Sequence, residues 1–252
     1  MDFVLIRLDE VDSTNNYAMA RIQHGGLPEG TVIQALQQHA GRGQRNKGWI
    51  SEPRANLLVS IILKPAVISH QPPFLLSMAV AAGLREAAAH ICQQDFYIKW
   101  TNDLYWNDRK AGGILIENTW KGQYWQYAVV GIGLNVNQKQ FPPELPNPVS
   151  LSQITGKEYE LQDVLQEVYD QIMKRYRDLQ GGKTRELIQE YHQWLYRKDQ
   201  EAWYESDGRR FRGIIREVQP DGHLIMDTAE GRKSWAFGQL EFVLDQPATP
   251  LP

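Results

Sequence analysis

Lys110 and the glycines that follow it, Gly112 and Gly113, have the clearest capacity for chemistry in this sequence. A lysine ammonium attracts an anion, and glycines let a ligand lie directly against the backbone. Asn102 and Asp103 precede this stretch and add polar side chains. Together these residues predict the edge of a pocket for an anion. The alternative is a solvated turn, because short motifs often occur by chance.

A basic loop at residues 37–49 is the second candidate. Between residues 42 and 54 there are four cations and one acid, namely Arg42, Arg45, Lys47, Arg54 and Glu52. A net-negative chain that concentrates cations in one loop is expected to hold an anion there. The loop lacks the G-x-x-x-x-G-K-[ST] pattern, which excludes a standard P-loop. A mobile turn and a short RNA-binding arm rich in arginine and glycine remain alternatives.

Three further positions have two interpretations each. Trp49 could stack on a base or belong to the core, which is the commoner fate of a lone tryptophan. Ser13 or Thr14 is expected to cap a short helix, and a helix N-terminus could also bind a polar ligand head. Gly131 and Gly133, inside an apolar run, predict close approach of a ligand to the backbone or a bulge. Without a third glycine they do not indicate a dinucleotide-binding fold.

The elements that must position these residues follow from the apolar pattern. Strands are expected at residues 3–8, 31–36, 56–64, 96–100, 114–116 and 124–136, and helices at 75–91, 161–172 and 184–196. Residues 96–116 are expected to form a hairpin-like unit, because Asn-Asp turn chemistry separates the two strands. From residue 201 short strands joined by Asp-Gly turns predict a small antiparallel barrel. Residues 246–252 are expected to be disordered.

Composition limits the classes of protein. The 252 residues, 42% of them hydrophobic, can bury a full core and predict one or two domains. A net charge of −3 and a pI near 6.1 argue against a main surface that binds nucleic acid. A single cysteine, Cys92, fits a reducing, cytoplasmic setting. No signal peptide or membrane-spanning run is expected, and the six histidines show no metal-ligand spacing.

Five motifs occur in a fixed order: Ser13-Thr14-Asn15, Gln38 with Gly41-Arg42-Gly43, Lys99-Trp100-Thr101-Asn102-Asp103-Leu104, Lys110-Ala-Gly-Gly-Ile-Leu-Ile-Glu117, and Gly131-Ile-Gly-Leu-Asn135. This set resembles the monofunctional biotin–protein ligases, closely over residues 12–137 and by layout beyond. The resemblance implies an α+β fold. A mixed-sheet catalytic domain of the biotin/lipoate ligase type would span residues 1–197, and an SH3-like β-barrel residues 198–245.

The resemblance also implies a reaction in two steps. Biotin and ATP, with Mg²⁺ brought by the ATP, would give biotinyl-5'-AMP and pyrophosphate. The adenylate would then modify one lysine of a biotin carboxyl carrier protein and release AMP. Neither DNA nor a membrane would be a partner, and edge strands of the sheet could pair in a homodimer, which no residue pattern decides.

Residue roles follow from the same resemblance. Lys110, Arg42 and Asp103 would be catalytic. Biotin would be bound by Ser13, Thr14, Asn15, Gln38, Gly41, Arg42, Gly43, Gln44, Lys110, Gly113 and Gly133. ATP would be bound by Arg45, Lys47, Trp49, Lys99, Asn102 and Asn135. A lysine ammonium is charged near neutral pH, so Lys110 is expected to be an electrostatic clamp. Asp103 would orient or deprotonate the acceptor lysine. The alternative interpretation is that Asp103 is only a turn residue.

Two positions depart from the family pattern. Gln44 stands where the family often has arginine, and Thr101 where it usually has proline. Gln44 removes one positive charge from the loop that would retain the adenylate. We therefore expect biotinyl-AMP to leave this chain more readily than a Gln44→Arg variant.

Three alternative functions stay open. A lipoate ligase would use a similar architecture, although the Gly-Arg-Gly and Lys-x-Gly-Gly details favour biotin. A nucleic-acid-binding protein could use the basic loop with Arg209, Arg210 and Arg212. Some biotin ligases also repress transcription through an N-terminal helix-turn-helix domain. Here the motifs begin at Ser13, so such a domain is not expected.

Overall fold

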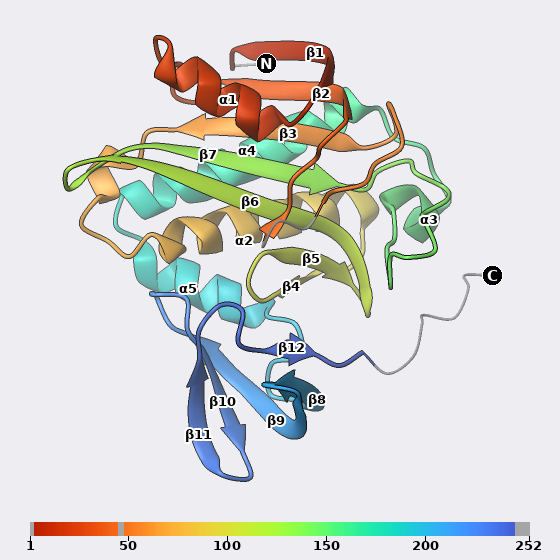
Figure 1. Cartoon of the computed structure of the whole chain (residues 1–252), viewed down its shortest axis with the longest axis vertical. Coiled ribbons are helices and arrows are strands. Elements are labelled where there is room, and N and C mark those ends of the chain that lie inside the picture. The colour runs from red at the N-terminus through yellow and green to blue at the C-terminus, as the bar shows by residue number, and fades with distance from the viewer. Residues whose placement is uncertain (1–2, 45–47, 245–252) are drawn as a thin grey trace.

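A seven-stranded mixed sheet forms the centre of the structure, a computed structural model that describes residues 3–44 and 48–244 (Figure 1). Its strands are β1 (Leu5–Val11), β2 (Val32–Gln38), β3 (Leu57–Leu63), β4 (Tyr97–Lys99), β5 (Asp103–Trp106), β6 (Arg109–Lys121) and β7 (Tyr124–Leu134). They lie in the order β1-β2-β3-β7-β6-β5-β4. β1 and β2 are parallel and the other neighbours antiparallel, which confirms the predicted mixed sheet.

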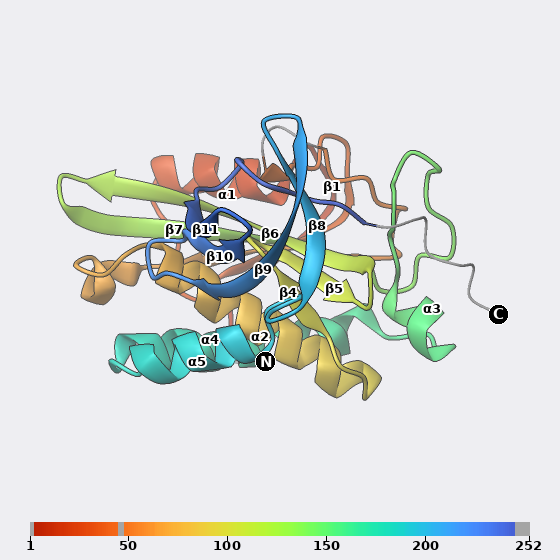
Figure 2. The same ribbon diagram turned by 90° about the horizontal axis from the view of Figure 1, so that it is seen from below.

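Helices cover both faces of this sheet. They are α1 (Thr14–Gln23), α2 (Phe74–Cys92), α3 (Leu151–Thr155), α4 (Leu161–Gln180) and α5 (Thr184–Gln193), with the 3-10 turn η2 (Pro65–Ile68). Figure 2 shows α1 on one side of the sheet and α2, α4 and α5 on the other. The three predicted long helices are confirmed, with α4 longer than expected and α5 shorter. The small α3 was not predicted, although its Ser150 and Gln153 form a capping box.

The apolar helix α2 lies between the sheet and α4. Among the described residues it is the one helix long and apolar enough to span a membrane, yet 67% of its most apolar window is buried inside the protein. A side-chain carbon added to Gly83 would lie 2.7 Å from the Ile172 Cα, so the glycine permits α2 and α4 to pack closely. α2 is therefore a core helix.

Residues 96–116 form three strands and not the predicted hairpin-like unit of two. The segment expected to be a polar turn contains β5, which pairs with β4 on one side and β6 on the other. Leu104 and Tyr105 are buried there, 2% exposed each. The prediction was wrong because Asn102 and Asp103 suggested one long turn, whereas the apolar residues after them supply a third strand.

A second, antiparallel sheet follows α5. Its strands are β8 (Glu201–Ser206), β9 (Arg209–Val218), β10 (Leu224–Thr228), β11 (Gly231–Trp235) and β12 (Glu241–Phe242). They lie in the order β11-β10-β9-β8-β12, and in the described part of the chain β11 and β12 do not pair. The small β unit is confirmed, but its hydrogen bonding stays open where a closed barrel was predicted. β12 is only two residues long and pairs with β8 alone among the described strands. The boundary after residue 197 stays a prediction, and the expected tail at 246–252 lies outside the described residues.

Candidate active site

A cleft of about 630 Å³ lies on one face of the central sheet and brings most of the predicted site residues together. The predicted residues that line it are Ser13, Thr14, Asn15, Gln38, Arg42, Gly43, Gln44, Trp49, Lys99, Asn102, Asp103, Lys110, Gly113, Gly133 and Asn135. Of the predicted residues that the structure describes, only Gly41 does not line it. Arg45 and Lys47 lie outside the described residues.

Strand register places four of these residues in one row. Lys99 on β4 is opposite Asp103 on β5, which is opposite Gly113 on β6, which is opposite Gly133 on β7. Side chains of directly opposed residues lie on the same face of a sheet. The row therefore presents two charged side chains beside two glycines along the floor of the cleft.

A β-bulge brings Lys110 to this face. The register between β5 and β6 shifts at Leu104/Tyr105, so that Tyr105 is opposite Lys110 and Ala111 has no partner. In a regular strand Lys110 and Gly113, three residues apart, would point to opposite faces. The extra residue of the bulge re-aims the side chain, and the Lys110 Nζ lies 2.7 Å from the Asp103 Oδ1.

The backbone of Lys110 is held by the chain segment after β7. Its N–H donates to the Asn147 carbonyl oxygen at 2.7 Å, and its own carbonyl oxygen accepts from the Val149 N–H at 2.9 Å. The Asn135 side-chain amide donates to the carbonyl oxygens of Val149 and Lys110, at 3.1 and 3.4 Å. Asn135, predicted to contact ATP, thus also fixes the position of Lys110.

The glycines of β7 leave room for two side chains of the protein itself. A carbon added to Gly131 would lie 2.4 Å from the Asn15 Oδ1, and one added to Gly133 would lie 2.4 Å from the Trp49 ring. The predicted approach of a ligand to these glycines stays a prediction, and in this structure Asn15 and Trp49 are the groups that lie against them. Trp49 is half-buried, and its ring centre is 5.7 Å from the Lys110 Nζ. It therefore covers the sheet at the cleft and is not an ordinary core residue.

Buried polar groups at the start of α1 form one end of the cleft. The Thr14 N–H donates to the Gln38 Oε1 at 2.7 Å. The Ser60 hydroxyl lies 2.8 Å from the Thr14 Oγ1 and 2.6 Å from the Asn15 Oδ1. Ser13 occupies the N-cap position but its side chain makes no capping hydrogen bond, and Thr14 is already the first residue of the helix. The predicted side-chain cap was wrong, and the Thr14 hydroxyl instead donates to the Gln38 Oε1 and accepts from the Ser60 hydroxyl.

Arg42 is held at the rim by groups that the sequence analysis gave no role. Its guanidinium lies 3.0 Å from the Glu117 Oε1 and donates to the Asn16 Oδ1 at 2.7 Å. Glu117 also accepts from the Asn15 side-chain amide at 2.9 Å. Glu117 was visible as the last residue of a motif, whereas Ser60 lies inside an apolar strand and gave no signal.

The cleft has a further wall that sequence reasoning missed. It comes from the loop before α3 and from the second sheet, with Phe141, Leu145, Pro146, Asn147, Pro148, Phe237, Gly238, Leu240, Glu241, Phe242 and Leu244. These residues carry little chemistry by type, and only the fold brings them beside Lys99 and Lys110. The proline-rich composition of residues 141–148 is typical of a loop, but it gives no information on where that loop lies.

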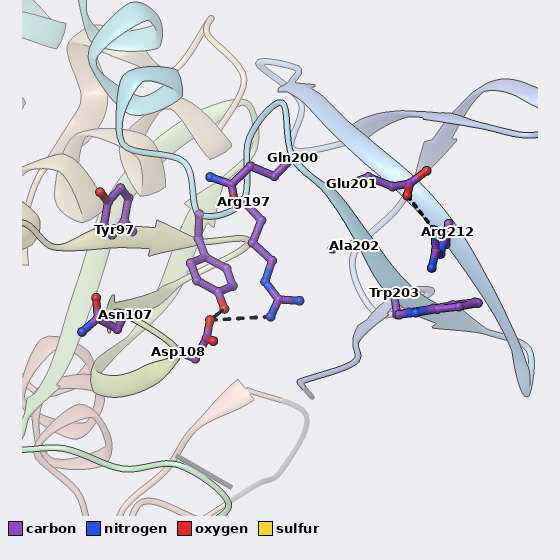
Figure 3. Close-up of a pocket in the computed structure, with 10 residues that line it drawn as sticks. Tyr97, Asn107, Asp108, Arg197, Gln200, Glu201, Ala202, Trp203 and Arg212 are labelled. Atoms are coloured by element: carbon purple, nitrogen blue, oxygen red, sulfur yellow. Dashed lines mark hydrogen bonds and ion pairs between the residues drawn. The ribbon is translucent and has the colours of Figure 1, made fainter. Parts of the chain in front are cut away.

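A second cavity, of about 620 Å³, lies where β4 and β5 meet β8 and β9. Figure 3 shows its charged side chains, in which Arg197 pairs with Asp108 at 3.5 Å and Arg212 with Glu201 at 2.9 Å. Among the described residues that line this cavity there is no glycine and none from the five motifs, so the cleft is the better candidate site.

The fold and the cleft define an α+β protein with a cationic ligand site over a glycine floor. The sequence model of the biotin/lipoate A/B protein ligase family matches residues 8–135. The chain belongs to this family.

Individual relatives agree with this assignment. The bifunctional ligase/repressor BirA of Bacillus spizizenii is 34% identical over 94% of this chain and 73% of that protein. The biotin–[acetyl-CoA-carboxylase] ligase of Paracoccus denitrificans is 32% identical over 59% of this chain and 63% of that protein. The solved structure of a biotin protein ligase from Aquifex aeolicus in complex with biotin and ATP superposes with a TM-score of 0.81 at 28% identity, covering 95% of this chain and 99% of that one.

Proposed function

We propose that this protein is a biotin–protein ligase, which joins biotin to ATP as biotinyl-5'-AMP and then transfers the biotinyl group to a lysine of a biotin carboxyl carrier protein. The observation that carries the proposal is the position of Lys110. The bulge and the Asn147–Val149 segment hold its ammonium beside a glycine floor, where two anions could meet.

The first step joins a carboxylate to a phosphate. An oxygen of the biotin carboxylate attacks the α-phosphorus of ATP, and pyrophosphate leaves with the electron pair of the broken P–O bond. Both reactants are negative, so fixed cations stabilise the charge that develops in the transition state. Lys110 and Arg42 supply them. The neutral polar groups of Thr14 and Gln38, which line the cleft, suit the polar, uncharged ureido ring of biotin.

The second step needs a neutral amine and a route for its proton. Asp103 is the carboxylate in the row beneath the cleft, and we assign it to orient the acceptor lysine and take its proton. Among the described residues there is no group of three or more His, Cys, Asp or Glu side chains that could hold a metal ion. Mg²⁺ therefore arrives with ATP in this proposal.

The setting of the reaction belongs to the same proposal. The lone Cys92 fits a reducing cytoplasm, and the protein acts without DNA or a membrane. A homodimer would pair through the outer edge of β1, because the other outer strand, β4, already bonds the chain after α5. There the Ile98 N–H donates to the Trp194 carbonyl oxygen at 2.8 Å, and the Ile98 carbonyl oxygen accepts from the Tyr196 N–H at 2.9 Å.

The deciding experiment is biotin-dependent exchange of labelled pyrophosphate into ATP. We expect exchange with biotin and none with lipoate or without an acid. Lys110→Ala should lose about 10²–10³-fold in rate, the usual cost of removing one transition-state donor. Lys121→Ala is the matched control, because Lys121 is exposed at the other end of β6. No exchange with any acid from folded wild-type protein would contradict the proposal.

Lipoate ligase is the alternative within the family, and exchange with lipoate alone would support it. Nucleic-acid binding has less support, because Arg210 pairs with Glu205 at 3.2 Å and Arg212 with Glu201 at 2.9 Å. RNA binding that is sensitive to salt and independent of ATP would restore that alternative.

A further inference from the structure

Lys99 is a second lysine on the cleft face of the sheet. It ends β4 directly opposite Asp103, and it lines the same cleft as Lys110. Its Nζ donates to the Tyr105 hydroxyl at 3.1 Å and lies 4.8 and 5.0 Å from the ring centres of Tyr105 and Phe242. Asp103 is therefore flanked by two lysines, and Lys110 is the one at ion-pair distance.

The groups around Lys99 come from three elements. Asp103 and Tyr105 belong to β5, Glu241 and Phe242 to β12, and Arg197 to the chain after α5. Burial lowers the pKa of Lys99, Arg197 lowers it further, and the carboxylates of Asp103 and Glu241 act in the opposite direction. Burial raises the pKa of Tyr105 to about 12, so its hydroxyl stays neutral and accepts the hydrogen bond from the ammonium.

The charged side chains that line the cleft, among the described residues, leave it positive. The cations are Arg42, Lys99 and Lys110, and the carboxylates are Asp103 and Glu241. A like charge nearby disfavours the protonated form of an amine, and a lysine placed next to another cation becomes a better nucleophile for this reason. An acceptor lysine that enters the cleft meets this field before it reaches the adenylate.

We propose, resting on the ligase function above, that Lys99 serves the second step: its ammonium, together with that of Lys110, makes the acceptor lysine enter the cleft as a neutral amine. The acceptor ammonium first loses one proton to water. Its nitrogen lone pair then forms a bond to the biotinyl carbonyl carbon, and AMP leaves with the electron pair of the broken carbon–oxygen bond. The surplus proton on the nitrogen passes to Asp103.

The second sheet has a part in this proposal. Phe242 of β12 lies against the Lys99 ammonium, and Tyr105 bonds it from the other side. A cation beside an aromatic face is attracted by the ring, so Phe242 is a positioning residue for Lys99. This contact gives the second sheet a defined task at the active site.

The test is the pH dependence of single-turnover transfer from preformed enzyme-bound biotinyl-AMP to a carrier-protein domain. Lys99→Met should move the midpoint of the transfer profile upward by about one pH unit, equal to about tenfold slower transfer at neutral pH. Lys99→Arg keeps the charge and should keep the wild-type midpoint. Lys121→Met is the control for loss of a lysine elsewhere. Phe242→Leu should shift the midpoint in the same direction as Lys99→Met, by less.

Three outcomes would overturn the inference. The first is a Lys99→Met midpoint equal to that of the wild type. The second is Lys99→Arg shifting as far as Lys99→Met, which would remove charge as the cause. The third is a Lys99→Met defect confined to a higher KM for ATP in pyrophosphate exchange, which would make Lys99 a nucleotide contact alone. If the wild type forms no biotinyl-AMP, the proposed function itself fails, and this result appears before any transfer is measured.

Discussion

The hydroxyl of Thr101 donates a hydrogen bond of 3.1 Å to the side-chain oxygen of Gln44. These are the two positions at which the sequence departs from the pattern of the ligases it resembles. Thr101 lies in the turn between β4 and β5, and Gln44 belongs to the basic loop after β2. The bond therefore connects the loop to the opposite side of the cleft. This hydrogen bond orients the Gln44 side chain, but it brings no positive charge to the adenylate.

Gln44→Arg should slow the release of biotinyl-AMP. An arginine would bring one more cation to the loop, and a hydrogen bond to a charged group contributes about 1.5–3 kcal/mol, so we expect release at least roughly tenfold slower. The measurement is the loss of labelled adenylate from the isolated complex over time. Gln193→Arg, an exposed position at the end of α5, controls for the added charge. Equal release rates for the wild type and Gln44→Arg would dismiss the hypothesis.

Asp103→Asn should impair transfer more than adenylate formation. Asparagine keeps the shape of the side chain but cannot take a proton, and loss of a general base commonly costs about 10²–10⁴-fold. The measurement is the rate of transfer from preformed biotinyl-AMP to the carrier protein. Asp9→Asn serves as the control, because the Asp9 side chain on β1 is 87% exposed. Undiminished transfer in Asp103→Asn would end the assignment as base.

Gly131→Ala should weaken both folding and biotin binding. The added methyl would lie 2.4 Å from the Asn15 Oδ1, so Asn15 must move and lose its contact with Ser60. Forcing extra volume into a packed site costs about 1–3 kcal/mol. Urea unfolding and biotin titration measure the two effects. Gly181→Ala is the matched control, because its methyl would make only ordinary contacts, at 3.4 Å. A Gly131→Ala protein with unchanged stability and affinity would contradict the prediction.

Cys92 should be unreactive in the folded protein. Burial raises the pKa of its thiol to about 11 from a reference value of 9.0. Two units reduce the reactive thiolate at pH 8 by about 100-fold, so iodoacetamide should label the folded chain at least that much more slowly than the chain in urea. Mass spectrometry follows the labelling, and similar rates in both states would refute the prediction.

The same shift has a consequence for stability. The folded state holds the Cys92 proton more tightly than the unfolded state. This contribution is fully present below pH 9 and is lost as the pH rises toward 11. The free energy of unfolding should therefore fall less between pH 9 and pH 11 in Cys92→Ala than in the wild type.

Motif order predicted well which residues line the cleft, because residues such as Lys110 and Asp103 show their chemistry by type, and the roles of these residues stay predictions. The placement of Lys99, Asp103, Gly113 and Gly133 in one row could not be predicted, since it depends on the register of four strands. The walls were missed for a different reason. Asn147 and Phe242 become part of the site only through contacts between segments far apart in the chain.

Local patterns failed where long-range packing decided the outcome. Ser13 and Thr14 are residue types typical of a helix cap. The structure shows no capping hydrogen bond from the Ser13 side chain, and both residues line the cleft. Asn102 and Asp103 are residue types typical of turns, so the sequence did not predict β5. This strand forms because it pairs with β4 on one side and β6 on the other. The second sheet was predicted from its Asp-Gly turns, but those turns carry no information on whether the ladder closes.

The bulge at Ala111 makes the length of β6 as important as its composition. Deleting this one residue would leave every motif side chain in the sequence, yet it would restore strict alternation and turn Lys110 toward the helices on the other side of the sheet. A substitution at the exposed Asn107, in the turn before β6, changes one side chain. A change of length instead moves the side chains on one side of it to the other face of the sheet. Among descendants of this sequence, insertions and deletions between β5 and Gly113 should therefore be rarer than substitutions.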